Sequence, residues 1–349
     1  MNVGLILVHM KIMKKLKNKI LADFVIVGSG NIALRHLENI HKKKPKSIIV
    51  IVKRSSSKLN PKFKKYSTLV TSEIDNIEPI SKKSSAFICS PATMHIDDSI
   101  ILAKSKFNLF IEKPLSSNTR SVKSLINIKN KYMLDIMVGY NLRFLDVFKK
   151  MNIILSKNKL GILKHVHIYV GSCYKKWRKN INYKDSVTHR SDLGGGVINE
   201  LSHEIDMMTA MFGLPDSLTS INFKKSKDKS SIDDTASSMF LYKNKKMCVT
   251  LHQNITTKHV SRYSIFEFDK GTIKLDLISN QITINSLHTG KVMDFKSNMS
   301  DSYVKELNYF LNNLGKNSMS NNLKNSINVI NIINSMKKNA ASLKTINYD

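Results

Sequence analysis

The chain has 349 residues, which is too long for one compact hydrophobic core and suits two domains. No apolar run approaches the roughly 20 residues that a helix needs to span a bilayer, so we do not expect a membrane as a partner. The three cysteines, Cys89, Cys173 and Cys248, lie far apart and form no CxxC pair. A disulfide-rich secreted protein is therefore excluded, and we expect a cytoplasmic location.

The formal net charge is +30. The lysines are spread over the whole chain instead of forming one stripe, so we do not expect nucleic acid as a partner. That alternative would require salt-sensitive binding to DNA or RNA. The excess of positive charge instead favours anionic small molecules through electrostatic steering.

A short apolar stretch, Val3 to Val8, is followed, not preceded, by lysines. That order does not fit a secretory signal, which carries its basic residues first. The pattern of elements also changes after Gly139. We therefore expect residues 1–19 to be an N-terminal extension, residues 20–139 a first domain and residues 140–349 a second domain.

The first domain opens with a strand, a turn, a helix and a strand. Residues 22–27 are a short apolar run, residues 31–44 repeat apolar side chains at helical spacing, and residues 47–52 form the next strand. The turn follows the spacing G-x-G-x-x-A, which in this context predicts a dinucleotide-binding turn with the pyrophosphate at the helix N-terminus. Its predicted cofactor-binding residues are Gly28, Ser29, Gly30, Asn31 and Ile32.

The end of the second strand bears on the choice of cofactor. NAD-specific folds carry an acidic residue there for the ribose 2′-hydroxyl, whereas this chain has Lys53, Arg54 and Ser55. Charged hydrogen-bond donors favour a 2′-phosphate, so NADP is predicted, with NAD as the second choice. A solvated basic turn with relaxed cofactor choice is the competing interpretation.

Two more predicted strands, residues 85–89 and 108–111, end in polar loops. In an open parallel sheet, ligands bind beyond the carboxyl ends of the strands. The residues of these loops that we predict to contact the cofactor are Ser90, Pro91, His95, Glu112, Lys113 and Pro114. The Lys113–Pro114 bond is a candidate for the cis form.

The second domain is richer in strands. Residues 144–155 and 197–212 have helical patterns, and the second of these follows a triple glycine. The predicted strands are residues 164–171, 235–243, 246–253, 262–268, 271–277 and 281–286. Runs of strands with few helices predict a mainly antiparallel sheet.

Several segments together resemble the Gfo/Idh/MocA family (glucose–fructose oxidoreductase / inositol dehydrogenase). They are GSGNIALRH at 28–36, SPATMH at 90–95, FIEKPLS at 110–116, VGYNLRF at 138–144 and LGGGVINELSHEID at 193–206. The resemblance implies an α/β protein with an N-terminal Rossmann parallel sheet and a C-terminal α/β domain that holds a large open, mainly antiparallel sheet. It also implies a homodimer or homotetramer, and hydride transfer between nicotinamide and a sugar-like carbinol.

By the same resemblance, Lys113 and His203 match the family's active-site lysine and histidine. Lys113 would polarise the reacting oxygen, and His203 would carry its proton, a role that suits an imidazole. Many family members have Asp four residues before this histidine, where this chain has Asn199. We expect the neighbouring Glu200 to take over that role. A site that works with Lys113 and His203 alone is the alternative.

The segment Tyr174 to Arg190 is the candidate for substrate recognition, because it combines six Lys/Arg residues with the only tryptophan. Aromatic rings can stack on a sugar, and arginine can fork onto a phosphate or carboxylate. We predict an anionic sugar, such as a nucleotide sugar or a sialic-acid-like acid used for surface glycans. Its predicted contacts are Arg143, Trp177, Arg178, Tyr183 and Arg190. A solvated basic loop is the competing interpretation.

Two histidines on one predicted strand, His165 and His167, have no further ligand nearby in the sequence, so no metal is expected. Two other functions use the same parts. A redox-neutral epimerase or glycosidase would oxidise and re-reduce one sugar with bound NAD, without stoichiometric production of NADPH. A non-catalytic dinucleotide-binding sensor would bind cofactor without turnover, although the presence of both Lys113 and His203 argues against it.

Overall fold

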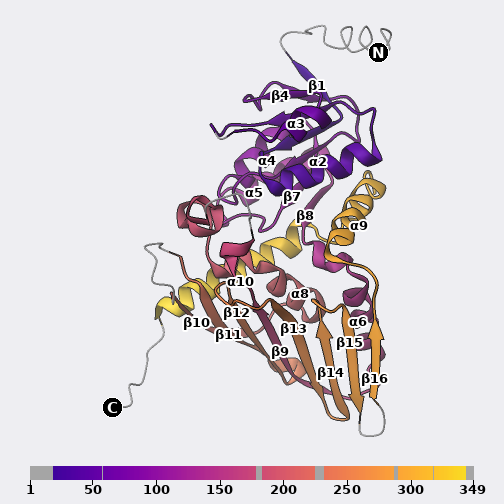
Figure 1. The fold of residues 1–349 in the computed structure, drawn as a ribbon, viewed down its shortest axis with the longest axis vertical. Helices are drawn as coiled ribbons and strands as arrows, with labels where there is room; N and C mark the ends of the chain where they lie inside the picture. Colours follow the sequence, from indigo (N-terminus) through magenta and orange to yellow (C-terminus); the bar gives the residue numbers. More distant parts are fainter. Residues whose placement is uncertain are drawn as a thin grey trace. The chain divides into compact units, whose positions relative to one another are not determined.

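The computed structural model describes residues 19–56, 58–177, 183–224, 232–286, 290–316 and 318–342. Residues 1–18 of the predicted extension lie outside this part of the chain. The chain forms two compact units (Figure 1). The first comprises the residues up to Gly139 together with Leu307–Leu323, and the second comprises Tyr140–Glu306 together with the residues from Lys324 onward.

The first unit holds a six-stranded parallel sheet in the order β4-β3-β2-β6-β7-β8, which confirms the predicted Rossmann sheet. Its strands are β2 (Phe24–Val27), β3 (Ile49–Val52), β4 (Leu69–Thr71), β6 (Ser85–Ile88), β7 (Asn108–Glu112) and β8 (Ile136–Gly139). A separate parallel pair joins β1 (Ile20–Ala22) to β5 (Ile77–Pro79). The helices between the strands are α2 (Asn31–Lys43), α3 (Pro61–Tyr66), α4 (His95–Lys104) and α5 (Val122–Tyr132).

A segment from near the C-terminus completes the core of the first unit. Helix α9 (Met299–Asn312) carries the fully buried Phe310, whose ring meets the rings of Phe87 and Phe110 edge-on at 5.7 and 5.6 Å. The Val138 amide also donates to the Asn321 carbonyl. These contacts explain why Leu307–Leu323 groups with the first unit, whereas the sequence boundaries put all of residues 140–349 in the second domain.

The second unit holds an eight-stranded sheet in the order β10-β11-β12-β9-β13-β14-β15-β16. Among its described strands, only β9 and β12 pair in parallel, so the prediction of a mainly antiparallel sheet is confirmed. The strands are β9 (Leu163–Gly171), β10 (Ser217–Phe223), β11 (Thr235–Tyr242), β12 (Met247–Asn254), β13 (Ser261–Phe268), β14 (Gly271–Asp276), β15 (Gln281–Ser286) and β16 (Gly290–Asp294).

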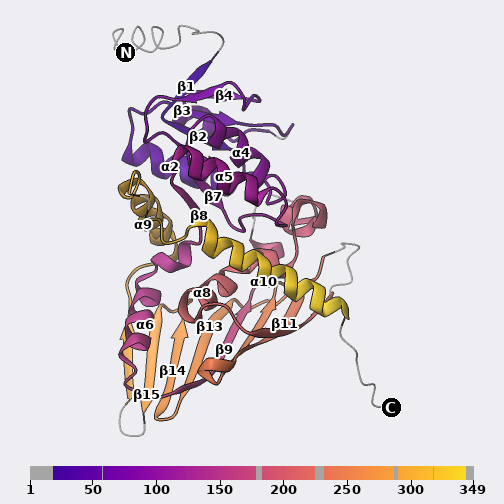
Figure 2. The same ribbon diagram turned by 180° about the vertical axis from the view of Figure 1, so that it is seen from behind.

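Helices cover one face of this sheet (Figure 2). They are α6 (Asp146–Lys157), α8 (Ser202–Phe212) and α10 (Leu323–Ser342). The buried Val166, Ile168 and Val170 alternate along β9 and form part of the core beneath them. On the other face, the ring of Tyr169 is stacked against both His252 and Tyr263, at 5.5 and 5.4 Å.

The helix predicted at residues 197–212 is broken in two. A short helix, α7 (Val197–Glu200), is capped by Leu201, and α8 begins at the next residue. Short 3₁₀ turns occur at η1 (Asn141–Phe144), η2 (Tyr174–Lys176), η3 (Tyr183–Asp185), η4 (Val187–His189), η5 (Ser191–Leu193) and η6 (Lys243–Lys245).

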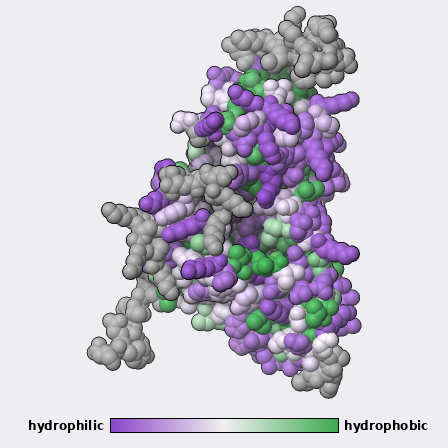
Figure 3. Space-filling view, viewed as in Figure 1, coloured by the Kyte–Doolittle hydropathy of each residue, from purple (hydrophilic) through white to green (hydrophobic). Residues whose placement is uncertain are grey.

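The surface agrees with the high charge. On the face that Figure 3 shows, the described residues are mostly hydrophilic, with scattered hydrophobic patches. Among the described residues, no helix has both the length and the apolar composition to cross a membrane.

Candidate cofactor site and catalytic residues

The turn after β2 has the geometry that a dinucleotide requires. Gly28 has a φ of +115°, and a Cβ there would lie 2.6 Å from the Cys89 carbonyl oxygen, so only glycine fits. A Cβ at Gly30 would meet nothing within 4 Å, which leaves open space beside the N-terminus of α2. Asn31 and Ile32 open this helix, and its first turn carries no acidic residue. These features fit a phosphate-bearing cofactor at the helix N-terminus.

The basic cluster after β3 has partners within the protein. The Lys53 ammonium donates to the Ser55 carbonyl oxygen. Nη2 of Arg54 lies 2.6 Å from Oδ2 of Asp98, and the Ser90 hydroxyl donates to the same oxygen at 2.6 Å. Asp98 comes from α4, far from Arg54 in the sequence, so the residues next to Arg54 do not reveal this carboxylate. The guanidinium predicted to hold a 2′-phosphate is therefore already paired with a carboxylate.

His95 connects the loops that follow β6 and β7. Its Nε2 lies 2.7 Å from the Ser90 carbonyl oxygen and its Nδ1 lies 2.9 Å from the Pro114 carbonyl oxygen. The ring is 1% exposed, and burial lowers the pKa of His95. The Lys113–Pro114 bond is cis, as predicted. A neutral imidazole has one N–H, so His95 donates to one of these two carbonyl oxygens while its buried ring contacts both loops. The Pro91 carbonyl accepts a turn hydrogen bond from the Met94 amide in the first loop.

Glu112 joins the strand that presents Lys113 to the helix of the glycine turn. Its Oε1 lies 2.7 Å from Nε2 of His36 on α2, and its Oε2 accepts from the Lys113 amide at 3.2 Å. The His36 ring lies beside the stacked rings of Phe87 and Phe110, at 5.3 and 4.9 Å from them. Glu112 was predicted to contact the cofactor, and the structure shows it buried in this internal pair. The His36 partner was present in the GSGNIALRH motif, but its role was not inferred.

In the second unit, His203 lies in the first turn of α8 beside a buried tyrosine. The ring of Tyr140 meets the His203 ring edge-on, with centroids 5.8 Å apart. Tyr140 is fully buried, and burial raises its pKa far above the ordinary value, so its hydroxyl stays protonated. Tyr140 was part of the quoted VGYNLRF segment, yet sequence reasoning did not select it.

Asn199 and Glu200 have partners of their own. The Asn199 amide donates to the Gly194 carbonyl oxygen at 2.8 Å, and its Oδ1 accepts from the Lys337 ammonium at 3.0 Å. The Thr188 hydroxyl donates to Oε1 of Glu200 at 2.9 Å. Burial lowers the pKa of Lys337, while nearby Asp233 opposes that change. Asn199 therefore secures the glycine-rich turn before α7.

Arg143 forms a bidentate pair with Asp206 on α8. Its Nε and Nη2 lie 2.7 and 2.6 Å from the two carboxylate oxygens. Asp206 is 1% exposed, and burial raises its pKa, which the Arg143 charge opposes. The predicted substrate-binding role of Arg143 thus has to compete with a buried ion pair.

The predicted substrate segment contains an aromatic cluster. The Tyr183 ring meets Tyr174 and His189 edge-on, both at 5.6 Å, and the Lys175 ammonium lies 4.6 Å from its centroid. Trp177 is 37% exposed and donates to the Ser172 hydroxyl. Arg190 pairs with exposed Asp192, and Arg178 lies outside the described residues. Trp177 and Tyr183 are thus the aromatic candidates for contact with a sugar.

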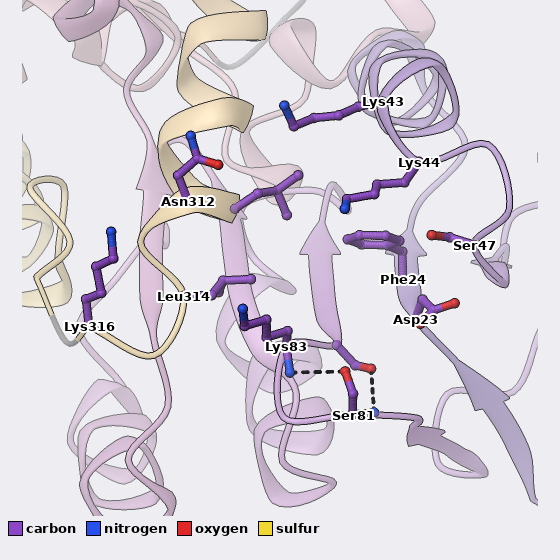
Figure 4. A pocket seen from close by; sticks show the side chains of 12 residues that line it. Asp23, Phe24, Lys43, Lys44, Ser47, Ser81, Lys83, Asn312, Leu314 and Lys316 are labelled. Carbon is purple, nitrogen blue, oxygen red and sulfur yellow. Dashed lines mark hydrogen bonds between the residues drawn. The ribbon is translucent and has the colours of Figure 1, made fainter.

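A cavity of about 830 Å³ opens at the other edge of the parallel sheet (Figure 4). Asp23 and Phe24 at the start of β2 and Ser84 before β6 line it, so it faces the amino ends of the strands. Its basic lining residues are Lys43, Lys44, Lys83 and Lys316. The hydroxyl oxygens of Ser81 and Ser84 accept backbone hydrogen bonds, which are drawn as dashed lines in Figure 4. None of the predicted cofactor residues lines this cavity.

Two family descriptions match the chain. "Oxidoreductase family, NAD-binding Rossmann fold" matches residues 22–140, and "GFO/IDH/MocA C-terminal domain" matches residues 148–274. Among curated proteins, "Uncharacterized oxidoreductase YrbE" of Bacillus subtilis is 25% identical over 54% of this chain and 53% of its own length. The trans-1,2-dihydrobenzene-1,2-diol dehydrogenase of Xenopus tropicalis is 25% identical over 61% of this chain and 64% of its own length. The chain thus spans between half and two thirds of these relatives.

Solved structures share the fold over about nine tenths of the chain. UDP-N-acetylglucosamine 3-dehydrogenase from Acidithiobacillus ferrooxidans is 14% identical, with a TM-score of 0.73 over 92% of this chain and 99% of its own. A levoglucosan dehydrogenase in complex with NADH and levoglucosan is 13% identical, with a TM-score of 0.78 over 92% of this chain and 98% of its own.

Proposed function

Because the chain belongs to the Gfo/Idh/MocA family of oxidoreductases, we propose that it transfers a hydride between a nicotinamide dinucleotide and a carbinol of a sugar derivative. The observation that carries this proposal is the carboxyl edge of the parallel sheet. The neighbouring strands β2, β6 and β7 end there in the Gly28 turn, the Ser90 loop and the Lys113–Pro114 loop. The buried His95 ring contacts the last two loops.

The dinucleotide would lie across Gly28 and Gly30, with its phosphates at the N-terminus of α2. When bound, its nicotinamide supplies or accepts the hydride. Lys53 and Arg54 favour the 2′-phosphate of NADP, while the pairing of Arg54 with Asp98 keeps NAD acceptable.

Lys113 and His203 would divide the acid–base work. Lys113 would hydrogen-bond the reacting oxygen, and His203 would take the hydroxyl proton as the hydride leaves the carbon. Glu200, three residues before His203 in the sequence, would stabilise the imidazolium that results. Asn199 is better suited to positioning, because its amide is engaged by Gly194 and Lys337.

We propose an anionic sugar as the substrate, such as a nucleotide sugar or a sugar acid. The net charge of +30 favours negatively charged ligands. Trp177 presents a partly exposed aromatic ring on which a sugar can stack, and Tyr183 in the neighbouring aromatic cluster is the second candidate. Among proteins of this fold, one is a UDP-N-acetylglucosamine 3-dehydrogenase and one is a levoglucosan dehydrogenase.

We further propose that the chain forms a homodimer or homotetramer through the open face of the eight-stranded sheet. Ile221, Met239 and Leu241 lie on one face of the paired strands β10 and β11, and each is more than two fifths exposed. Exposed apolar side chains gathered on one face are typical of an interface. Light scattering of the purified protein that gives the mass of a monomer would contradict this assembly.

Turnover with a panel of nucleotide sugars and sugar acids tests the catalytic roles. Lys113→Met and His203→Ala should each lower turnover by roughly 10²–10⁴-fold while NADH and NADPH still bind. The matched controls are the exposed Lys123→Met and His259→Ala, which should behave as the wild type. Near-normal turnover of His203→Ala would overturn the acid–base assignment.

A further inference from the structure

Arg54, Asp98 and Ser90 form a small cluster at the edge where the cofactor is expected. We propose that Asp98 sets the cofactor preference: its buried carboxylate neutralises Arg54, so that NAD and NADP bind with similar affinity. This inference rests on the proposed function, because it concerns the dinucleotide that the Gly28 turn would hold. Neither the sequence motifs nor the comparisons single out Asp98.

The cluster lies next to the glycine turn. Strands β3 and β6 are the two neighbours of β2 in the sheet, so Arg54 after β3 and Ser90 after β6 come from either side of that turn. In this fold the adenosine ribose lies at the end of the second strand, which here is β3. Arg54 therefore occupies the place from which a side chain reads the ribose 2′ position.

Asp98 acts through Arg54. Its side chain is 2% exposed, so it cannot reach a ligand itself. Its Oδ2 accepts from both the Arg54 guanidinium and the Ser90 hydroxyl, which fixes the carboxylate in place. The Arg54 side chain remains 34% exposed, so part of the guanidinium still faces outward. A ligand that binds Arg54 is therefore also close to the negative charge of Asp98.

This arrangement discriminates by charge. A 2′-phosphate beside Arg54 would be attracted by the guanidinium but repelled by Asp98 a few ångströms behind it. A ribose 2′-hydroxyl carries no charge and can accept from the same guanidinium without that repulsion. The Lys53 ammonium is turned toward the Ser55 carbonyl and does not restore the lost charge on Arg54. The predicted preference for NADP is therefore reduced by the protein's own carboxylate.

The wild-type protein provides the first test. Fluorescence titrations of the full chain with NADH and NADPH should give dissociation constants within about tenfold of each other. A preference for NADPH of more than about a hundredfold would overturn the proposal, whatever the behaviour of any variant.

The variant Asp98→Asn isolates the charge, because an asparagine oxygen still accepts from Arg54 and Ser90. It should raise the ratio of NADPH to NADH affinity about tenfold, with most of the change in NADPH. Competition with 2′-AMP and 5′-AMP should show the same preference for the 2′-phosphate. Asp97→Asn is the matched control, since the exposed Asp97 neighbours Asp98 on α4 and loses the same charge. It should leave the ratio unchanged.

The outcomes separate the two proposals. If both dinucleotides bind but Asp98→Asn leaves the ratio unchanged or lowers it, Asp98 does not set the preference, and the proposed function stands. An equal shift in Asp97→Asn would assign the effect to general charge and also overturn the role of Asp98. If neither dinucleotide binds the wild type, the proposed function fails and this inference fails with it.

Discussion

Nε2 of His36 lies 2.7 Å from Oε1 of Glu112, although 76 residues separate them in the chain. His36 belongs to the helix that opens at the glycine turn, and Glu112 ends the strand that presents Lys113. The side chains are only 1% and 10% exposed. The pair therefore ties the predicted phosphate-binding helix to the segment that carries a predicted catalytic lysine.

His36 and Glu112 should contribute to stability as a strongly coupled pair. In a double-mutant cycle of His36→Asn and Glu112→Gln, the coupling free energy of unfolding should be about 1–3 kcal/mol, because the pair is shielded from water. Denaturant unfolding measures it. The exposed Lys62–Glu38 pair is the control and should couple much more weakly. Additive effects of His36→Asn and Glu112→Gln would contradict an energetic link.

Acid should destabilise the protein through His95. Burial lowers the pKa of His95 below its ordinary value of 6.5, so the unfolded chain takes up this proton first as the pH falls. The free energy of unfolding is then lost as the pH falls from about 6.5 toward the folded-state pKa. His95→Gln should lose less stability than the wild type between pH 7 and pH 5, as seen by thermal unfolding. The control His259→Gln, at an exposed histidine, should lose as much stability as the wild type. If His95→Gln also loses as much stability as the wild type between pH 7 and pH 5, the assignment to His95 is refuted.

Local patterns predicted much of the first unit. The Gly28 turn, the helix after it and the cis Lys113–Pro114 bond depend on residues close together in the chain, so their signals are visible in the sequence. The parallel sheet of the first unit and the mainly antiparallel sheet of the second also agree with what the resemblance implies.

Partners that come from distant segments could not be predicted in this way. Asp98 reaches Arg54 only because α4 packs beside β6, and Lys337 reaches Asn199 across 138 residues. The ion pair of Arg143 with Asp206 likewise depends on how η1 and α8 pack. Periodicity and spacing describe single elements, whereas these contacts depend on tertiary packing, which single-sequence patterns do not encode.

Substitution of the two glycines of the turn by alanine should have different effects. Gly28→Ala should destabilise the protein by about 2 kcal/mol or more, because its φ is positive and a Cβ would meet the Cys89 carbonyl. Gly30→Ala should change stability by less than about 1 kcal/mol, since the space there is open. It should nevertheless weaken dinucleotide binding at least about tenfold by occupying the place of the phosphates. Unchanged NADH affinity in a folded Gly30→Ala protein would argue against a cofactor at this turn.

The Arg143–Asp206 pair should be costly to split. Arg143→Met leaves a buried carboxylate without its partner and should destabilise the protein by about 3–5 kcal/mol. The double variant Arg143→Met/Asp206→Leu should recover part of this loss, because no buried charge remains. Chemical denaturation measures both. A small loss of stability in Arg143→Met would contradict this expectation and would favour the substrate-binding role of Arg143 predicted from the sequence.

The proposed function requires hydride transfer between nicotinamide and a sugar carbon, and an isotope-transfer experiment detects that step directly. The purified protein is incubated with NADH or NADPH that is deuterated at nicotinamide C4. The substrates are a panel of keto forms of nucleotide sugars and sugar acids, and mass spectrometry detects deuterium in the products. We expect deuterium on one carbon of a sugar with the wild type and at least about a hundredfold less with Lys113→Met. Tight binding of the dinucleotides without deuterium transfer to any sugar would contradict it.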